Sequence, residues 1–428
     1  MARRFRFLFW FTLCFLGGGG TVRADGVAAE EARLRSFNAK EQALLEPFLR
    51  DGPVGLVEFR GGAEVPAVLW MAHMDGKAKT IVEILSRPEH YPSFMPLDAV
   101  RVTGRNGASL SYEWDWKTSF VTLTGTSRLT VLKPPPGQES RGYRVEITHL
   151  KGDMGRGRMV WRIVPRADGT STVTLSSRID LRDANWATRQ IEHGKQSVNR
   201  TVNLALSFAI LRSIERQTTR KHPKTSRRAT PPSPPRTEGP PTGVPRPEIR
   251  AETFARLLNR GDLVWTTMEG DQLLRAAALS RTGQPLTRVR QVLADPATIG
   301  RALIPGSFVR LGARTGRRID FEWGIDLPLI GTTGSMQYVD HGSHVEIDAV
   351  GGDVQGGRWR VEAQPYGRKE GAILSWGVFD PSKASWIIRV LVAGNRDLGH
   401  GIVVGAQVMV NRAIRIRAEQ EANASARP

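Results

Sequence analysis

The sequence predicts an α+β fold that occurs twice along the chain, once on each side of a proline-rich linker. Three observations support this prediction. Short motifs recur in the same order in both halves, each half contains a block of strand-like segments, and each half ends in a long helical pattern. Strands in one block with helices at the ends are typical of an antiparallel sheet packed against a helix.

The internal repeat rests on five landmarks that follow one order at similar spacing. The first-half landmarks and their counterparts are Ile84–Pro88 and Val292–Pro296, Tyr112–Trp114 and Phe321–Trp323, Gly152-Asp153 and Gly352-Asp353, Trp161 and Trp359, and Trp186 and Trp386. Two copies indicate a tandem domain, because a solenoid needs more repeats.

Each copy should begin with a strand and a short helix. In the first copy these cover Val65–Ala72 and Ala78–Leu85, and the helix ends shortly before a proline. Six further strands are expected over Ala99–Thr103, Leu110–Trp116, Val121–Leu132, Tyr143–Leu150, Met159–Val164 and Thr172–Leu181. The copy closes with apolar residues at helical spacing from Trp186 to about Gln217.

The chain divides into four parts. Residues 1–24 read as an export signal, 25–220 as the first domain, 221–249 as a linker and 250–428 as the second domain. The linker is rich in proline and has almost nothing apolar to bury, which is typical of an extended spacer.

The first two dozen residues predict export. A basic start is followed by ten apolar residues, Phe7–Leu16, and by a small-residue cleavage site that ends at Ala24. Ten apolar residues are too few to span a bilayer, which needs about 20; the alternative is an uncleaved interfacial anchor. Cys14, the single cysteine, lies in this segment, so the mature protein would have no disulfide, as in a bacterial periplasmic or secreted protein with large cores.

The order of the elements resembles the START-like, Bet v 1-like superfamily (SRPBCC), which includes polyketide cyclase/dehydratase-like and coenzyme-Q-binding START domains. The resemblance rests on the segment 84–96, the Tyr112–Trp116 strand, the Gly152–Trp161 hairpin and the terminal helix, and covers about 60–217 and 265–419. It implies a helix-grip fold in each copy, in which a curved antiparallel sheet wraps a long C-terminal helix. Members of the superfamily leave a cavity there for lipids, sterols, polyketides or quinones.

The second copy departs from this pattern. It has Thr298–Arg301 where the first copy has His90–Ser93, and its terminal helix contains Gly394, Gly399, Gly401 and Gly405. The glycines predict a kinked or looser helix.

Aromatic residues are the candidate ligand-binding groups. Strand alternation places Tyr112, Trp114 and Trp116 on one face and the carboxylates between them on the other. These aromatics would line a cavity or fill the core. The same alternatives apply to Trp161, Trp186, Phe321, Trp323, Trp359 and Trp386, and Phe94 and Met95 would form an adaptable apolar gate.

Catalytic and metal-binding motifs were not found. Glu113 and Glu322 should face solvent, and the eight histidines are scattered, with His341 and His344 assigned to a hairpin turn. We therefore expect no catalytic residue, no metal and no cofactor. The formal charge of +19 favours acidic partners, but no nucleic-acid reader motif is present, so peripheral contact with anionic membrane is the favoured interpretation.

These observations predict an exported, periplasmic or secreted binding protein that holds an apolar molecule such as a lipid, quinone or polyketide-like compound. The alternative is a cyclase or dehydratase enzyme that uses a cavity His, Asp or Tyr as base. A third hypothesis is that the cavities are filled and the copies act as interaction domains. An enzyme needs a titratable side chain with a perturbed pKa in the cavity, whereas a carrier needs only an apolar lining and an opening.

Overall fold

The computed structural model describes residues 36–58, 67–117, 122–180, 196–221, 246–297, 300, 307–325, 332–385, 389 and 396–425. All of them lie in the compact unit Ser36–Pro428. None of the described helices is long and apolar enough to cross a membrane. We call residues 36–221 the first copy and residues 246–425 the second copy.

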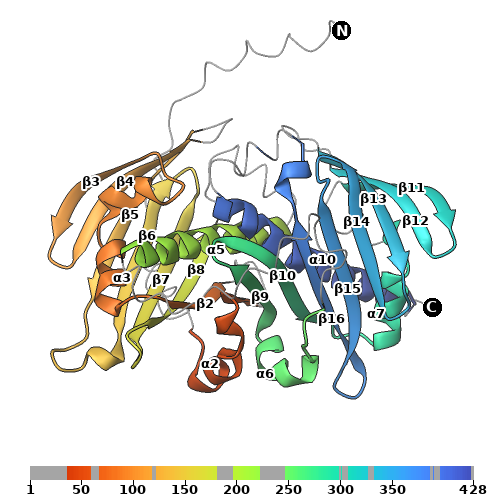
Figure 1. The fold of residues 1–428 in the computed structure, drawn as a ribbon, viewed down its shortest axis with the longest axis horizontal. Helices are drawn as coiled ribbons and strands as arrows, with labels where there is room; N and C mark the ends of the chain where they lie inside the picture. The colour runs from red at the N-terminus through yellow and green to blue at the C-terminus, as the bar shows by residue number, and fades with distance from the viewer. Residues whose placement is uncertain are drawn as a thin grey trace, which may run out of the picture. The chain divides into compact units, whose positions relative to one another are not determined.

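The described part of the first copy contains eight strands and a long terminal helix (Figure 1). Its elements are α2 (Ala39–Leu45), η1 (Phe48–Arg50), β1 (Val54–Glu58), β2 (Val68–Met74), α3 (Ala78–Leu85), η2 (Pro88–Ser93), β3 (Ala99–Asn106), β4 (Ser109–Lys117), β5 (Thr122–Leu132), η3 (Glu139–Arg141), β6 (Tyr143–Gly152), β7 (Arg156–Pro165), β8 (Ser171–Asp180) and α5 (Gln196–Lys221). The expected strands and the short helix are confirmed within a few residues.

The second copy repeats this order, which confirms the duplication. Its elements are η5 (Ala251–Phe254), α6 (Ala255–Leu258), β9 (Gly261–Glu269), β10 (Gln272–Arg281), α7 (Leu286–Leu293), β11 (Ser307–Thr315), β12 (Arg318–Ile325), β13 (Thr332–Asp340), β14 (His344–Gly352), β15 (Gly357–Tyr366), β16 (Glu370–Phe379), η6 (Pro381–Lys383) and α10 (Arg396–Ser425).

All sixteen described strands form one antiparallel sheet. Their order is β11-β12-β13-β14-β15-β16-β10-β9-β1-β2-β8-β7-β6-β5-β4-β3, so the second half of the order mirrors the first. The two copies meet where β1 pairs with β9, with Val54 opposite Trp265 and Leu56 opposite Leu263. The sequence analysis missed β1 and β9. All five residues of β1 are buried, so this strand has no polar alternation by which to recognise it.

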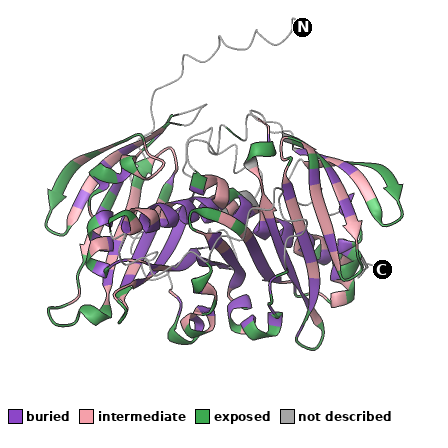
Figure 2. Cartoon of the chain, viewed as in Figure 1, coloured by how far each residue is buried: buried purple, intermediate pink, exposed green. Residues whose placement is uncertain are grey.

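The terminal helices pack on the sheet and on each other. Each buries an asparagine against a strand: Asn203 Nδ2 donates to the carbonyl of Ser177 at 3.2 Å, and Asn411 Nδ2 donates to that of Ala278 at 3.1 Å. Figure 2 shows buried residues along both helices and the strands beneath them. We call this side of the sheet the inner face.

The helix α10 is continuous, and two of its glycines have a packing role. A Cβ atom on Gly401 would lie 2.5 Å from the carbonyl oxygen of Ala205 in α5, and one on Gly405 would lie 2.5 Å from the Thr201 side chain. The expected kink does not interrupt the helix, and these two glycines let α10 approach α5 closely. Gly394 lies outside the described residues.

The last residues of the proline-rich segment pack against the second copy. Arg246 forms two hydrogen bonds with Glu362, at 2.6 and 2.9 Å, and Ile249 is buried. Residues 222–245 of the segment lie outside the described residues.

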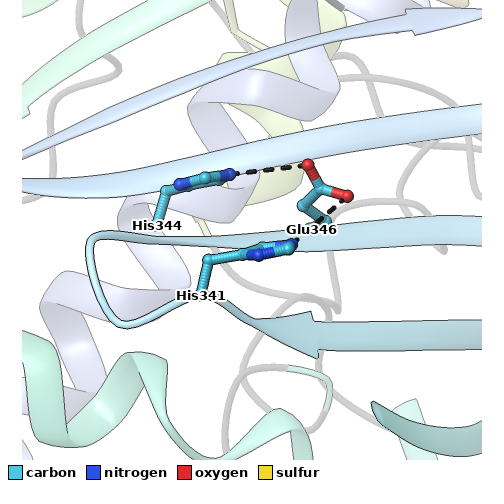
Figure 3. Close-up of side chains that lie close together, drawn as sticks. All are labelled: His341, His344 and Glu346. Atoms are coloured by element: carbon cyan, nitrogen blue, oxygen red, sulfur yellow. Dashed lines mark hydrogen bonds and ion pairs between the residues drawn. The ribbon is translucent and has the colours of Figure 1, made fainter. Parts of the chain in front are cut away.

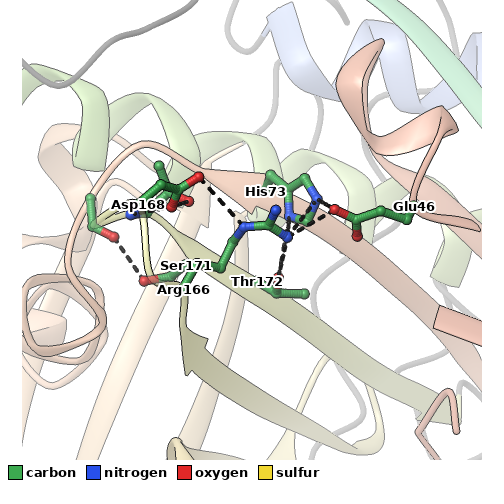
Figure 4. A network of polar contacts seen from close by, with 8 residues as sticks. Glu46, His73, Arg166, Asp168, Ser171 and Thr172 are labelled. Atoms are coloured by element: carbon green, nitrogen blue, oxygen red, sulfur yellow. Dashed lines mark hydrogen bonds and ion pairs between the residues drawn. The ribbon is translucent and has the colours of Figure 1, made fainter. Parts of the chain in front are cut away.

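A polar network fixes α2 to the sheet on the side away from α5 (Figure 4). Glu46, which ends α2, accepts hydrogen bonds from His73 of β2 and from Arg166, both at 3.0 Å. Burial alone would raise the pKa of the Glu46 carboxyl, but His73 and Arg166 hold it below its usual value. The network therefore has a structural role.

Candidate functional site

The candidate site is a cavity in the first copy, between the inner face of the sheet and α5. Its volume is about 100 Å³. Leu206 and Ile210 of α5 form one wall, and Met95, after η2, lies in the lining. Leu398 of α10 packs against Ile179 and Leu206, so the second copy supports this wall.

Five of the candidate residues from the sequence meet around this cavity: Met95, Tyr112, Trp114, Trp116 and Trp161. The alternation expected for β4 is confirmed, because its residues are alternately buried and partly exposed up to Trp114. Glu113, on the other face, pairs with Arg101, which agrees with a solvent-facing role.

The remaining gate candidate, Phe94, packs beside the cavity. Its ring lies edge-on to that of Tyr91, with centroids 5.9 Å apart, and Tyr91 lines the cavity. Trp186 lies outside the described residues.

A glycine makes room for the largest lining group. A Cβ atom on Gly125 of β5 would lie 2.3 Å from the Trp114 ring. The indole therefore lies flat over the neighbouring strand, and its Nε1 donates a hydrogen bond to Ser127 Oγ at 3.0 Å.

A polar row is formed by Tyr112, Ser127 and His149 on adjacent strands, and Tyr112 and His149 line the cavity. Ser127 is opposite Tyr112 on one side and opposite His149 on the other. Ser127 Oγ and His149 Nδ1 are 2.8 Å apart. Because the Trp114 indole is a donor only, Ser127 Oγ accepts its proton and can donate its own to His149 Nδ1.

Burial perturbs two members of the row. It lowers the pKa of His149 to about 4 and raises the pKa of Tyr112, the latter despite an opposing hydrogen bond with Ser127. At neutral pH both groups are uncharged. A neutral His149 that accepts at Nδ1 carries its proton on Nε2 and can donate it to a ligand.

Sequence reasoning did not select His149, although a signal for it was present. Along β6 the buried residues Tyr143, Val145 and Ile147 alternate with more exposed ones. Extending that period by one step places His149 on the inner face.

The second copy has an apolar row at the same places. The strand register shows that Trp323 corresponds to Trp114. Trp114 lies opposite Gly125 of the next strand, and Trp323 lies opposite Gly334. The residues that correspond to Tyr112, Ser127 and His149 are Phe321, Met336 and Ala349. The first copy alone has this polar row.

The candidate aromatics of the second copy contribute to its core. Phe321 and Trp323 are buried in it, and Trp359 packs against it. Trp323 Nε1 donates to the carbonyl of Gly300 at 3.3 Å. Trp386 lies outside the described residues.

Acid should destabilise the protein through His149. In the folded state its pKa is about 4, compared with an ordinary value of 6.5, so the unfolded chain binds the proton more readily. The stability that the neutral form provides is fully present above about pH 6.5 and is lost as the pH falls toward 4, at a cost of roughly 3 kcal/mol. We expect urea unfolding of His149→Gln to be less pH-dependent in this window than that of wild type. The exposed His90→Gln should keep the wild-type slope; equal slopes in all three proteins would contradict the burial of His149.

One close group of potential metal ligands occurs in the described part of the chain, away from the cavity. His341, His344 and Glu346 come together at the hairpin between β13 and β14. The expectation that no close histidine cluster exists is therefore wrong, because the turn brings His341 next to the start of β14. The two histidines flank the hairpin turn, as expected, but both also contact Glu346 of β14.

Comparison with known proteins supports the fold. Residues 74–189 match the family described as polyketide cyclase / dehydrase and lipid transport. No curated protein sequence matches the chain.

Solved structures with a similar arrangement include the di-domain ARO/CYC StfQ from the steffimycin biosynthetic pathway, at 13% identity and a TM-score of 0.29, covering 83% of this chain and 99% of that one. A STAR-related lipid transfer protein from Xanthomonas axonopodis is 16% identical with a TM-score of 0.33, over 39% of this chain and 94% of that one. Such distant similarity carries no functional argument. Together, the repeated strand order, the packing of each copy's strands on its terminal helix and the family match in the first copy show that the chain carries tandem START-like helix-grip domains.

Proposed function

We propose that the protein binds an apolar small molecule that carries one hydrogen-bonding group, and that the first copy is the binding site. The observation that carries this proposal is that Tyr112 and His149 of the polar row line an otherwise apolar cavity, while Ser127 is hydrogen-bonded to His149. Buried polar groups are costly unless they are hydrogen-bonded. A ligand carbonyl or hydroxyl group next to His149 would accept a hydrogen bond from its Nε2 proton.

The size of the cavity limits what it holds as described. A cavity of about 150 Å³ accommodates a single benzene ring, so a volume of about 100 Å³ is too small for a lipid or polyketide. Binding of such a molecule requires the lining to move outward. Met95 and Met154 line the cavity, and methionine adapts its shape at low cost. We propose that these residues move when the ligand enters.

An enzyme of the cyclase or dehydratase type is the second candidate, because a neutral histidine faces the cavity. A general base works best when its pKa is near the working pH. A pKa of about 4 for His149 makes it a weak base, which favours a binding role. Deuterium exchange next to the ketone of 2-tetralone, followed by NMR, tests catalysis: exchange that is faster than in buffer and lost in His149→Gln would establish the enzymatic role.

We further propose that the protein acts after export, at an anionic membrane surface. An open groove of about 1040 Å³ lies beside α3 in the first copy. Lys79, Arg105 and Lys133 are among its lining residues, and the neighbouring Leu132 is 45% exposed. Basic and apolar groups at one rim suit contact with anionic lipid head groups.

Two fluorescent probes test the binding site. Prodan is an apolar fluorophore with a ketone, and pyrene has no polar group. We expect wild type to bind both with enhanced fluorescence. His149→Phe should weaken prodan binding by about tenfold, the value of one hydrogen bond, and leave pyrene binding intact. Gly125→Ala should weaken both, because the added methyl group pushes Trp114 into the cavity.

The matched control is Gly334→Ala, which changes the corresponding glycine of the second copy. This variant should bind both probes as wild type does. Absence of probe binding in wild type would overturn the proposal, as would full binding by Gly125→Ala. A loss in Gly334→Ala alone would place the ligand in the second copy.

A further inference from the structure

The hairpin between β13 and β14 brings two imidazoles and a carboxylate together (Figure 3). The Nε2 atom of His344 is 3.4 Å from Glu346 Oε1, and that of His341 is 3.5 Å from Glu346 Oε2. The two rings are stacked, with centroids 4.7 Å apart and planes 12° apart. One potential ligand atom from each residue lies within 4.8 Å of the other two.

We propose that these three side chains bind a divalent transition-metal ion, of which Zn²⁺ is the reference case. Zinc in proteins is tetrahedral, with bonds of about 2.0–2.2 Å to histidine nitrogen and carboxylate oxygen. Ligand atoms of such a site are therefore about 3.3–3.5 Å apart. The distance of 3.5 Å from His341 Nε2 to Glu346 Oε2 already has this value. His344 Nε2 lies 3.4 Å from the other oxygen, Oε1, so its ring must turn toward Oε2 for both histidines to share one ion.

The ligand set identifies the class of metal. Two imidazoles and one carboxylate suit zinc and its transition-metal neighbours, whereas Mg²⁺ and Ca²⁺ prefer sites made of oxygen atoms. Three protein ligands leave the fourth position to water, as in open zinc sites.

The strand and the turn fix the arrangement. His344 and Glu346 are two residues apart on β14, so both point to the outer face, while the intervening Val345 is buried in the core. The Gly342 amide donates to Asp340 Oδ1 at 2.7 Å, and the His341 amide donates to the carbonyl of His344 at 3.0 Å. This tight turn returns His341 to the side of His344. The site therefore lies on the opposite side of the sheet from α10.

A neighbouring arginine orients the carboxylate. Arg360 Nε is 3.0 Å from Glu346 Oε1, and its Nη1 donates to Asp348 at 2.8 Å. Asp348 offsets the positive charge of Arg360, which would otherwise oppose a bound cation. Oε1 can keep its contact with Arg360 while Oε2 binds the metal, as is common for carboxylates that a second residue orients.

The first copy has an arginine at the position of His344. Counting back from Gly152-Asp153 and Gly352-Asp353, Glu146 corresponds to Glu346 and Arg144 corresponds to His344. Arg144 forms an ion pair with Glu146 at 2.5 Å. A permanently charged guanidinium cannot bind a metal ion, whereas an imidazole can. The difference gives the second copy a capability that the first does not have.

The test is a zinc titration of the full chain without an affinity tag, followed by calorimetry at mildly alkaline pH. We expect one strong Zn²⁺ site in wild type. His344→Arg, which reproduces the pair of the first copy, and His341→Asn should each weaken zinc binding by more than about tenfold. Cobalt(II) should give the intense visible bands of tetrahedral coordination in wild type, and both variants should lose them.

Two controls keep the result decisive. His90→Asn removes an exposed histidine of the first copy and should bind zinc as wild type does. The urea midpoint without metal should stay near the wild-type value in both ligand variants, because the side chains are partly exposed. Absence of zinc binding in wild type would overturn the proposal. Undiminished binding in both ligand variants would also overturn it, since the zinc would then occupy other residues.

Discussion

Replacing Arg212 by alanine should lower the free energy of unfolding by about 3–5 kcal/mol, because it leaves a buried charge network without its central cation. Arg212 of α5 is 2% exposed and donates to Glu215 at 2.5 Å and to the carbonyl of Gly270 at 3.0 Å. Gly270 belongs to the second copy, so the side chain joins the copies. Burial alone would lower the pKa of Arg212, but Glu215 and Asp397 raise it, which agrees with a paired charge. Urea unfolding measures the loss.

Arg310→Ala is the control for this measurement. Arg310 pairs with Glu322 at 3.1 Å, but its side chain is 72% exposed, and exposed pairs contribute about 0–1 kcal/mol. Equal losses in the two variants would show that the Arg212 network is hydrated and that the inter-copy contact does not depend on it.

Replacing Trp114 by alanine should reduce both stability and ligand affinity. Its side chain is buried, and Trp→Ala in a core costs about 3–5 kcal/mol. Trp114 also lines the cavity, so apolar probes should bind about 10–100-fold more weakly. Urea unfolding and probe titration separate the two effects.

Trp323→Ala makes the matching change in the second copy. It should cost a similar amount of stability and leave probe affinity unchanged, since Trp323 belongs to the second core. Normal probe binding by Trp114→Ala would show that Trp114 fills the core without contacting ligand, which was the alternative interpretation of the aromatic pattern.

Much of the fold could be predicted because the information is local. The alternation around Trp114 identified both the strand β4 and its inner face, and the expected ranges of the six strands that follow α3 agree with the structure within a few residues. β1 could not be recognised because it is buried on both faces. Its partner is also distant, more than 200 positions away in the sequence.

The sites depend more strongly on pairing between strands. Ser127 and His149 are neighbours only because β5 and β6 are in register, and no motif links 127 with 149. Likewise, His341 approaches His344 through a turn whose geometry is set by the Asp340 side chain. Scattered histidines in a sequence therefore do not exclude a cluster in the fold.

The pairing of β1 with β9 gives a reason for keeping a second copy in which the corresponding row of side chains is apolar. A copy on its own would expose β1, a fully buried strand, as a free edge, and such edges promote aggregation. In one chain, the tether keeps a matching edge at a high effective concentration. The tandem protein thus behaves as a covalently linked dimer, in which the second copy is a permanent cap. That role constrains the β9 edge and leaves the second interior free to diverge.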